Sequence, residues 1–359
     1  MYAEALPSDA VTRFDLEDPT DLARLQDPKL ALQDLSGIVV IDEIQRAPGL
    51  FEVLRVLTDR VSNPARFLIL GSASPDMIRQ SSETLAGRIQ YIELTPFHLS
   101  ETGPGTSRRL WVRGGFPRSY LAESDSDSLT WRRSFVSTYL ERDVPNLGIR
   151  IAPQALRRMW MMLVHCHGSF LNASDFSRSL GISDKTVRFY LDTLSGMYMV
   201  RLLAPWFENI AKRQVRSPKI YFRDSGIFHS FLGLETYDEM LAHPKLGASW
   251  EGFALEEVIR ASGCSEEEAF FWSSHGKAEL GLLLVRGFHK RGFEIKYTSR
   301  PTLTRSMRLA MDDLGLETLD IVFPGDETFP LADGVTAVGL VRLVEQLAGG
   351  ARTNQEAEQ

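Results

Sequence analysis

The sequence predicts a multidomain α/β protein in which a parallel sheet comes first, a helical segment follows and a second α/β domain comes last. Up to about residue 100, short β-branched runs alternate with amphipathic helical segments. Strand-like runs return only after residue 262. With 359 residues, of which 43% are hydrophobic, the chain can bury two or three cores. The expected parts are 1–100, 101–150, 151–223, 224–348 and a disordered tail, 349–359.

The first part consists of strand–helix units. Residues 11–17 and 66–70 are strand-like, and residues 21–35 and 50–61 have helical apolar spacing. The run 38–41 is continuously β-branched, as in a parallel strand buried on both faces, and its end is the place where polar chemistry is expected.

The middle of the chain is predicted to be helical and basic. Residues 101–150 form a helical connector. Gly181 permits a tight turn and Ser183 is a candidate N-cap for a helix over 184–194, which together indicate a helix-turn-helix. Residues 151–223 hold eleven Lys and Arg against four acids, although the whole chain has a net charge of -7. Such a basic segment is typical of a nucleic-acid-binding module, and solvated surface charges explain it nearly as often.

The last part alternates again between helix and strand. Residues 250–262 have a helical pattern, and strands are expected at 270–272, 280–285, 292–296 and 319–323. No apolar run approaches the roughly 18 residues of a membrane span. The amino-terminus does not read as a signal peptide. We therefore expect a cytoplasmic protein without a membrane partner.

Two acids at the end of the run 38–41 form the first candidate site. Asp42 and Glu43 have the form of a Walker B element, in which the aspartate holds Mg²⁺ and the glutamate orients the attacking water. Ser72 follows the next apolar strand and is predicted to lie beside Asp42, because neighbouring parallel strands end at the same edge. Acids that end a strand are also ordinary surface residues.

The sequence resembles prokaryotic AAA-type ATPases that carry a C-terminal domain of unknown function related to restriction endonucleases. The ordered matches are residues 38–48 (IVVIDEIQRAP), 67–72 (FLILGS), 83–88 (ETLAGR), 93–94 (EL), 114–117 (GGFP), 139–143 (YLERD), 212–213 (KR), 217–222 (SPKIYF), 224–226 (DSG), 250–253 (WEGF) and 293–296 (FEIK). The resemblance implies a P-loop (AAA-type) parallel sheet, a winged-helix middle and a restriction-endonuclease-like α/β end.

For the site, the resemblance implies ATP and Mg²⁺ as cofactors. Asp42 and Glu43 become the Walker B acids, with Asp42 on the metal, and Ser72 becomes the first sensor. Arg88 is a candidate phosphate-facing arginine at a subunit junction, and a surface ion pair explains it equally well.

The chain departs from that family at its front. Members begin with a strand followed by G-x-x-x-x-G-K-[ST], whose N–H groups and lysine hold the phosphates. The 359 residues contain no such loop, and the one Gly-Lys pair, Gly276-Lys277, is followed by Ala278. We expect an incomplete sheet, a shortened gene product or misplaced start, and impaired ATP binding and hydrolysis.

The helix-turn-helix is the second candidate site. Lys185, Thr186 and Arg188 open its second helix and could enter a major groove of DNA. Winged helices also serve as protein–protein modules, so a partner protein or another copy of the chain remains an alternative.

The last part carries the third candidate. Glu294 and Lys296 on one strand resemble the E-x-K half of a metal-dependent nuclease site, with Glu251 as a further ligand. The usual aspartate is replaced by Gly281. Glu279 could substitute, but we expect it to face away unless a bulge intervenes. A Glu-x-Lys strand is often a plain ion pair.

Three functions therefore compete. The first is an ATP-driven switch or remodeller near DNA, which is inactive as an ATPase in this form. The second is a non-catalytic DNA- or protein-binding adaptor. The third is a Mg²⁺-dependent nuclease.

Overall fold

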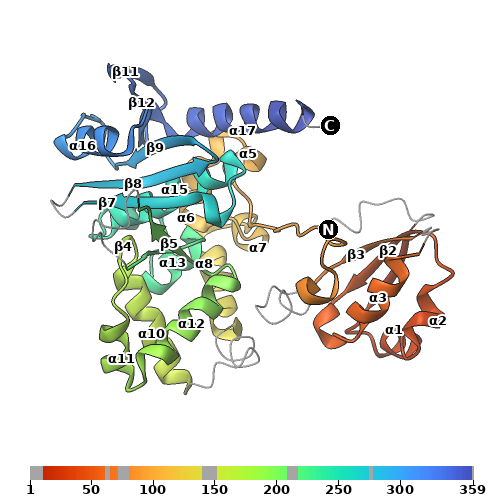
Figure 1. Cartoon of the computed structure of the whole chain (residues 1–359). Coiled ribbons are helices and arrows are strands. Elements are labelled where there is room, and N and C mark those ends of the chain that lie inside the picture. Colours follow the sequence, from red (N-terminus) through yellow and green to blue (C-terminus); the bar gives the residue numbers. More distant parts are fainter. Residues whose placement is uncertain are drawn as a thin grey trace. The chain divides into compact units, whose positions relative to one another are not determined.

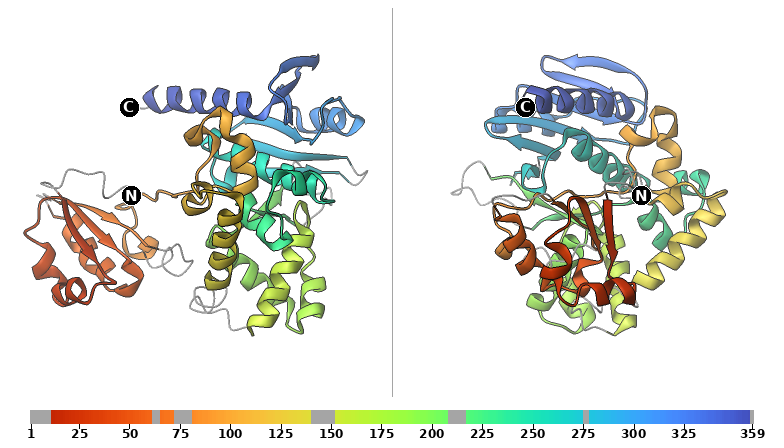
Figure 2. Two further views of the ribbon diagram at one scale, coloured as in Figure 1. Left: turned by 180° about the vertical axis from the view of Figure 1, so that it is seen from behind. Right: turned by 90° about the vertical axis from the view of Figure 1, so that its right-hand side faces the viewer.

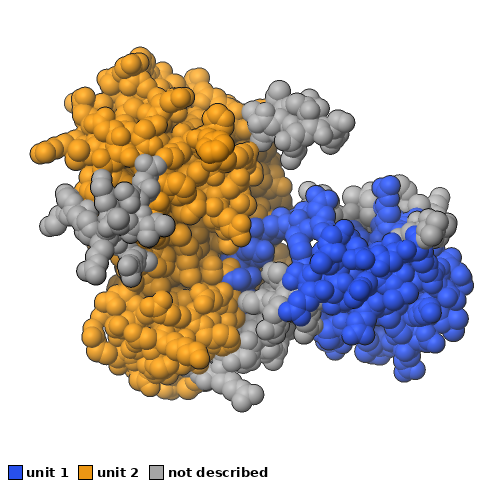
Figure 3. Space-filling view, viewed as in Figure 1, with its two compact units in different colours: residues 1–94, 196–198 blue, residues 95–195, 199–359 orange. Residues whose placement is uncertain are grey.

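A computed structural model describes residues 11–60, 65–71, 81–139, 152–207, 217–274 and 278–357. The chain divides into two compact units (Figure 3). Unit 1 comprises Met1–Leu94 and the short stretch Gly196–Tyr198, and unit 2 comprises Thr95–Ser195 and Met199–Gln359. Each unit contains its own hydrophobic core.

Unit 1 is built on a parallel sheet of three strands in the order β1-β2-β3 (Figure 1). Its elements are β1 (Val11–Asp15), α1 (Pro19–Arg24), α2 (Pro28–Leu32), β2 (Gly37–Asp42), the short 3₁₀ helix η2 (Ile44–Arg46), α3 (Leu50–Thr58) and β3 (Ala65–Ile69). Because the strands are parallel, they end at one edge, where Asp15 pairs in register with Asp42. The predicted parallel α/β sheet is confirmed.

The single helix expected over residues 21–35 is wrong. The structure has two short helices there, because Asp27 and Pro28 start a new one. The Asp27 side chain accepts a hydrogen bond from the N–H of Leu30 at 3.1 Å. Proline has no N–H to give to a preceding turn and is well suited to the first turn of a helix. Asp27 and Pro28 therefore start a new helix within a stretch whose apolar spacing is helical throughout.

Unit 2 contains a mixed nine-stranded sheet with the order β11-β12-β10-β9-β8-β7-β5-β6-β4 (Figure 1). The strands are β4 (Ser169–Phe170), β5 (Val200–Pro205), β6 (Lys219–Phe222), β7 (Ala269–Ser273), β8 (Glu279–Arg286), β9 (His289–Ile295), β10 (Leu319–Phe323), β11 (Thr328–Ala332) and β12 (Val335–Gly339). β4, β5 and β6 come from the predicted helix-turn-helix segment. The middle of the chain and its last part therefore share one sheet.

Helices cover both faces of this sheet (Figure 2). The helices of unit 2 are α5 (Leu99–Thr102), η3 (Pro104–Thr106), α6 (Ser107–Arg113), α7 (Pro117–Tyr120), α8 (Asp125–Thr138), α10 (Pro153–Cys166), α11 (Ala173–Leu180), α12 (Asp184–Gly196), α13 (Ser225–Leu232), α14 (Tyr237–Leu241), α15 (Leu246–Ser262), η5 (Glu266–Glu268), α16 (Arg305–Leu314) and α17 (Leu340–Ala357). Val322 packs in one core with α15 and α17, whereas its neighbour Ile321 packs with α16. This alternation is expected of a strand buried on both faces.

The last helix, α17, includes most of the tail that the sequence predicts to be disordered. It spans Leu340–Ala357. Gly349 and Gly350 lie inside it, and glycine weakens a helix without necessarily ending it.

A close junction joins the loop after α6 to the start of α13. The carboxylate of Asp224 is fully buried and accepts hydrogen bonds from the N–H groups of Gly115 and Ile227, both at 2.8 Å. A Cβ at Gly226 would lie 2.0 Å from the carbonyl oxygen of Arg113, and a Cβ at Gly115 would lie 2.1 Å from that of Phe97. The backbones therefore touch where only glycine fits.

Candidate functional site

The carboxyl edge of the unit 1 sheet carries Asp42 and Glu43. Asp42 ends β2, and its Oδ1 accepts a hydrogen bond from the N–H of Glu43 at 2.9 Å. Glu43 has a left-handed backbone, with φ 56° and ψ 44°. Such a backbone is uncommon for residues other than glycine and clusters at functional sites. The conformation marks this turn as a candidate site on grounds independent of its sequence.

Acidic groups dominate this edge. Burial raises the pKa of the Glu43 carboxyl, a hydrogen bond from Gln45 opposes that rise, and the carboxylates of Asp42, Glu17 and Asp15 add to it. Repulsion among like charges favours either proton uptake or a bound cation. The edge is therefore acidic and carries oxygen ligands of the kind that Mg²⁺ prefers, although among the described residues no three such side chains are grouped to hold a metal.

The end of β3 lies next to the same edge. The N–H of Leu70 donates to the carbonyl of Ile41 at 2.9 Å, and the N–H of Ile44 donates to the carbonyl of Leu70 at 3.2 Å. Ser72, the predicted sensor, lies two residues further on and outside the described residues.

Arg88 lies at the opposite edge of the sheet. Its Nη2 donates to Oδ2 of Asp59 at 3.0 Å. Asp59 directly follows α3, and the next residue, Arg60, donates to the carbonyl of Gln33 at 3.0 Å, just before β2 begins. The structure therefore does not bring Arg88 to Asp42, and within unit 1 it forms the surface ion pair that was its alternative reading.

Two apolar segments of unit 1, β3 and residues 90–94, are little covered by other described residues of that unit. The one strand that pairs with β3 in the described sheet is β2. Residues 90–94 form no helix or strand, and Ile92 and Leu94 are 79% and 77% exposed. Parallel sheets are normally covered on both faces and flanked by further strands, and adjoining exposed apolar residues indicate an interaction site.

The second candidate site lies at the start of α12. Lys185 and Arg188 are exposed, whereas the hydroxyl of Thr186 lies 2.8 Å from that of Ser183 and its N–H donates to the same oxygen at 3.1 Å. Ser183 therefore caps the helix as predicted, after a left-handed Gly181 with φ 69°. Lys185 and Arg188 are available for a partner, while Thr186 is already engaged.

The third candidate site is assembled in unit 2. Glu251 of α15, Glu279 of β8, Glu294 of β9 and Lys296 just after β9 lie in one cluster. Nζ of Lys296 lies 2.7 Å from Oε1 of Glu294, whose Oε2 accepts a hydrogen bond from the N–H of Gly281 at 3.1 Å. Although burial opposes its charge, the carboxylates of Glu294, Glu251 and Glu279 raise the pKa of Lys296.

The sequence led us to expect Glu279 to face away from this cluster unless a bulge intervenes. Glu279 belongs to the cluster, where it pairs with Lys219, and the pairing of β7 with β8 does shift register next to Gly281, between Leu280 and Leu283. A Cβ on Gly281 would lie 3.8 Å from Oε2 of Glu294. The glycine leaves that position without the carboxylate that a nuclease would need.

Sequence reasoning missed two members of the cluster, Lys219 and Tyr221 of β6. Lys219 forms ion pairs with Glu279 and, at 3.6 Å, with Glu251. The hydroxyl of Tyr221 donates to Oε1 of Glu251 at 2.7 Å. Burial and these carboxylates raise its pKa well above the ordinary value. Their spacing of two on a strand was the available signal, because it places both side chains on one face.

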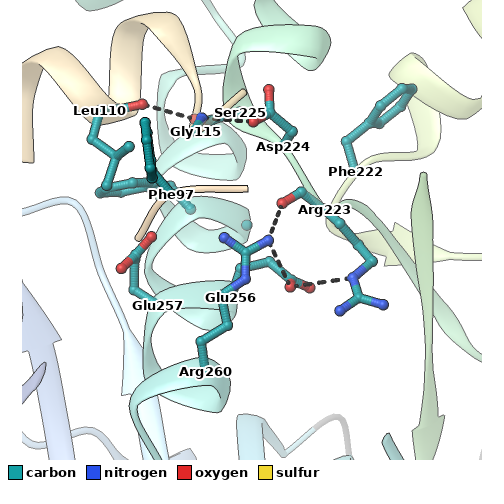
Figure 4. Close-up of a pocket in the computed structure, with 12 residues that line it drawn as sticks. Phe97, Leu110, Gly115, Phe222, Arg223, Asp224, Ser225, Glu256, Glu257 and Arg260 are labelled. Carbon is teal, nitrogen blue, oxygen red and sulfur yellow. Dashed lines mark hydrogen bonds and ion pairs between the residues drawn. The ribbon is translucent and has the colours of Figure 1, made fainter. Parts of the chain in front are cut away.

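A buried network of charges lies beside the glycine junction (Figure 4). Glu256 contacts Arg201 at 3.0 Å, Arg223 at 3.5 Å and Arg260 at 3.6 Å. Burial works against the charged form of Glu256, yet the three arginines hold its pKa at about 2. The neighbouring Glu257 accepts a hydrogen bond from the N–H of Leu99 at 2.7 Å, and burial raises its pKa to about 7.

The cavity within this network has a volume of about 10 Å³. That is room for about one water molecule. The network therefore serves to hold α15 in place rather than to bind a substrate. Its sequence signal was weak, since two adjacent acids on a helix are usually exposed.

Comparisons with known proteins place the chain. Over 325 residues it is 50% identical to uncharacterized proteins of Mycobacterium tuberculosis (Rv2008c) and Mycobacterium bovis (Mb2031c), covering 90% of this chain and 73% of each relative. The model of an AAA domain matches residues 1–103, and two domains of unknown function match residues 105–238 (DUF8612) and 246–343 (DUF4143). The chain belongs to this AAA-domain family. No solved structure matches it.

The resemblance to AAA-type proteins with C-terminal domains of unknown function is thereby confirmed. Asp42, Glu43 and Arg88 lie in the AAA match, and Lys185 and Arg188 lie in the first domain of unknown function. The glutamate–lysine cluster lies in the second domain of unknown function, except for Lys219 and Tyr221, which belong to the first.

The described helices include none that is both long and apolar enough to cross a membrane.

Proposed function

We propose that unit 1 supplies the metal- and water-positioning half of an ATP-hydrolysing site, in an ATP-driven switch or remodeller that acts near DNA. The observation that carries this proposal is the turn at Asp42 and Glu43, which places two carboxylates at the sheet edge of an AAA-family domain and holds Glu43 in a left-handed backbone. In this role Asp42 holds Mg²⁺ and Glu43 orients the attacking water.

The residues present fit only half of such a site. The carboxylates suit Mg²⁺, but the 359 residues contain no G-x-x-x-x-G-K-[ST] loop for the phosphates. Exposed Ile92 and Leu94, together with β3, offer apolar surface that an added strand would cover. We therefore propose that a strand and a phosphate-binding loop from outside these residues complete the site.

The first test is steady-state ATP hydrolysis by the 359-residue chain. We expect no turnover above that of the Glu43→Gln variant, because the phosphates lack their N–H and lysine ligands. Turnover by the unmodified chain that Glu43→Gln removes would show that the site is already complete and would overturn this part of the proposal.

A second role, DNA binding, is favoured by the arrangement around α12. The order α10, β4, α11, α12, β5, β6, with β6 paired between β5 and β4, supports the winged helix that the resemblance implies, and Lys185 and Arg188 are exposed within the first five residues of α12. We propose that this module contacts DNA phosphates with these two side chains.

Fluorescence anisotropy with labelled duplex DNA tests the second role. The double variant Lys185→Ala/Arg188→Ala is expected to bind more weakly and to lower the slope of log K against log salt by about 2, since two phosphate contacts are lost. Arg178→Ala is the matched control, because Arg178 is an exposed cation of the same module that pairs with Asp175. Equal loss in both variants would point to general charge rather than to a binding face.

The same titration separates a switch from an adaptor. Once the site is completed, Mg-ATP is expected to change the DNA affinity of a switch, whereas an adaptor binds DNA equally with and without it.

The third function, a nuclease, is not proposed, because two ammonium groups occupy the carboxylates of the glutamate cluster in unit 2. In the described part of the chain, no three His, Cys, Asp or Glu side chains are placed to hold a metal.

A further inference from the structure

We infer that the ammonium group of Lys219 is the resident cation of Glu251 and Glu279 in the glutamate cluster of unit 2, and that it excludes a divalent metal from these two carboxylates. The inference concerns unit 2 alone and is independent of the ATPase proposal.

The contacts of Lys219 are those of a cation in a carboxylate site. Its Nζ lies against Oε1 of Glu279 and 3.6 Å from Oε1 of Glu251. The two carboxylates come from different elements, β8 and α15, and meet at this one ammonium. An ammonium and a metal ion compete for the same oxygen lone pairs.

Burial makes Lys219 a fixed member of this site. Its side chain is 5% exposed. The rings of Phe170 and Phe271 lie 5.9 Å and 5.7 Å from Nζ and add cation–π attraction. A buried ammonium is tolerated only where such partners offset its lost hydration, so removing the carboxylates or the lysine alone leaves an uncompensated charge.

Lys296 offers an internal comparison. It forms an ion pair with Glu294 at 2.7 Å, and its side chain is 53% exposed. A long, hydrated side chain can rotate away at little cost, whereas the buried side chain of Lys219 starts from β6, between β5 and β4, and has no comparable route. Lys219 rather than Lys296 therefore determines whether a second cation can enter.

The placement of Lys219 also links two matched domains. It lies on β6, in the segment that pairs with β4 and β5, and its partners lie in the last part of the chain. The ion pairs thus hold the strands of the winged-helix-like segment against α15 and β8, in the way that a structural metal would.

Titration with Mn²⁺ tests the inference, using calorimetry and the electron paramagnetic resonance signal of free Mn²⁺. The wild-type chain is expected to bind no Mn²⁺ at the cluster. Lys219→Met keeps the length of the side chain without its charge, and is expected to bind one Mn²⁺ at least about tenfold more tightly than wild type, since the repelling charge is gone. Adding Glu279→Gln to Lys219→Met should abolish that binding.

The matched control is Lys296→Met, which should behave like the wild-type chain. A folded Lys219→Met variant that binds Mn²⁺ no better than wild type, or a Lys296→Met variant that binds it as well as Lys219→Met does, would overturn the inference. If Lys219→Met does not fold, the melting temperature of the wild-type chain tests the inference instead. That temperature should not change with Mn²⁺ more than it does in an NaCl control of equal ionic strength. A rise in the melting temperature with Mn²⁺ that Glu279→Gln removes would contradict the inference.

Discussion

Acidification from pH 6.5 to pH 4.5 is expected to lower the free energy of unfolding of unit 2 by about 3 kcal/mol. The main cause is a pair of buried histidines, His167 and His229, whose pKa values burial lowers to about 3. In the unfolded chain they bind protons near pH 6.5, so the stability they contribute is present above that pH and is lost as the pH falls, at about 1.4 kcal/mol per pH unit for each.

Burial keeps both rings neutral, and at His167 a hydrogen bond adds to this effect. Nδ1 of His167 accepts from the N–H of Phe222 at 3.0 Å, so a proton there would face another donor. Nε2 of His229 lies 2.6 Å from the hydroxyl of Ser249, and its Nδ1 lies 3.1 Å from the carbonyl of Val112. Both partners of His229 can accept, so the cost of protonating it is the burial of the charge.

Glu257 opposes the histidines over part of this range. Because burial raises its pKa to about 7, its contribution is present below the ordinary value of 4.5 and is lost as the pH rises through 7. Between pH 4.5 and pH 6.5 two histidines act against one glutamate, which leaves a net slope of about 1.4 kcal/mol per pH unit.

Urea unfolding followed by tryptophan fluorescence measures this slope in unit 2 alone, because all six tryptophans lie there. His229→Asn should remove about 1.4 kcal/mol per pH unit from the slope, and Glu257→Gln should add about the same amount. Slopes that do not move in opposite directions in these two variants would contradict the assignment of the buried groups.

Gly226→Ala is expected to destabilise unit 2 by about 3 kcal/mol or more. The added Cβ would lie 2.0 Å from the carbonyl oxygen of Arg113, 2.4 Å from its carbon and 2.7 Å from the N of Gly114. All three are backbone atoms, so the clash cannot be relieved by rotating a side chain, and overpacking of this kind typically costs about 1–3 kcal/mol, occasionally more. The same unfolding assay measures the loss.

Gly247→Ala is the matched control. Gly247 also lies in a helix, α15, but its Cβ would meet nothing within 4 Å. Alanine there should be neutral or should stabilise by up to about 1 kcal/mol, because it favours the helix and restricts the unfolded chain. Similar effects of the two substitutions would show that the glycine junction is not closely packed.

Local patterns predicted the elements that form by themselves. The β-branched run before Asp42 became β2, and Ser183 caps α12 as its position after Gly181 suggests. The predicted strands at 270–272 and 319–323 became β7 and β10. In each case the signal is short-range, since periodicity or a cap residue depends on the nearest few neighbours.

Features that depend on long-range packing were not predictable in this way. Lys219 joins the glutamate cluster only because β5 pairs with β7, which brings β6 into the same sheet as β8 and Lys219 to Glu279, about sixty residues away in the chain. The placement of Arg88 at the far edge follows from its ion pair with Asp59, and nothing in its local sequence indicates that partner. Gly226 likewise reads as an ordinary helix residue until its neighbour from α6 is known.

The most direct test of the central claim is ATP hydrolysis by a chain in which a strand, a G-x-x-x-x-G-K-T loop and a helix precede Val11. Circular dichroism and urea unfolding should first show that the extended chain is folded. We expect turnover that Glu43→Gln abolishes and that Glu17→Gln, which removes an exposed acid paired with Arg46 near the same edge, leaves in place. A folded extended chain that binds ATP and turns it over equally with and without Glu43→Gln would contradict the assignment of this edge as the hydrolysing half of the site.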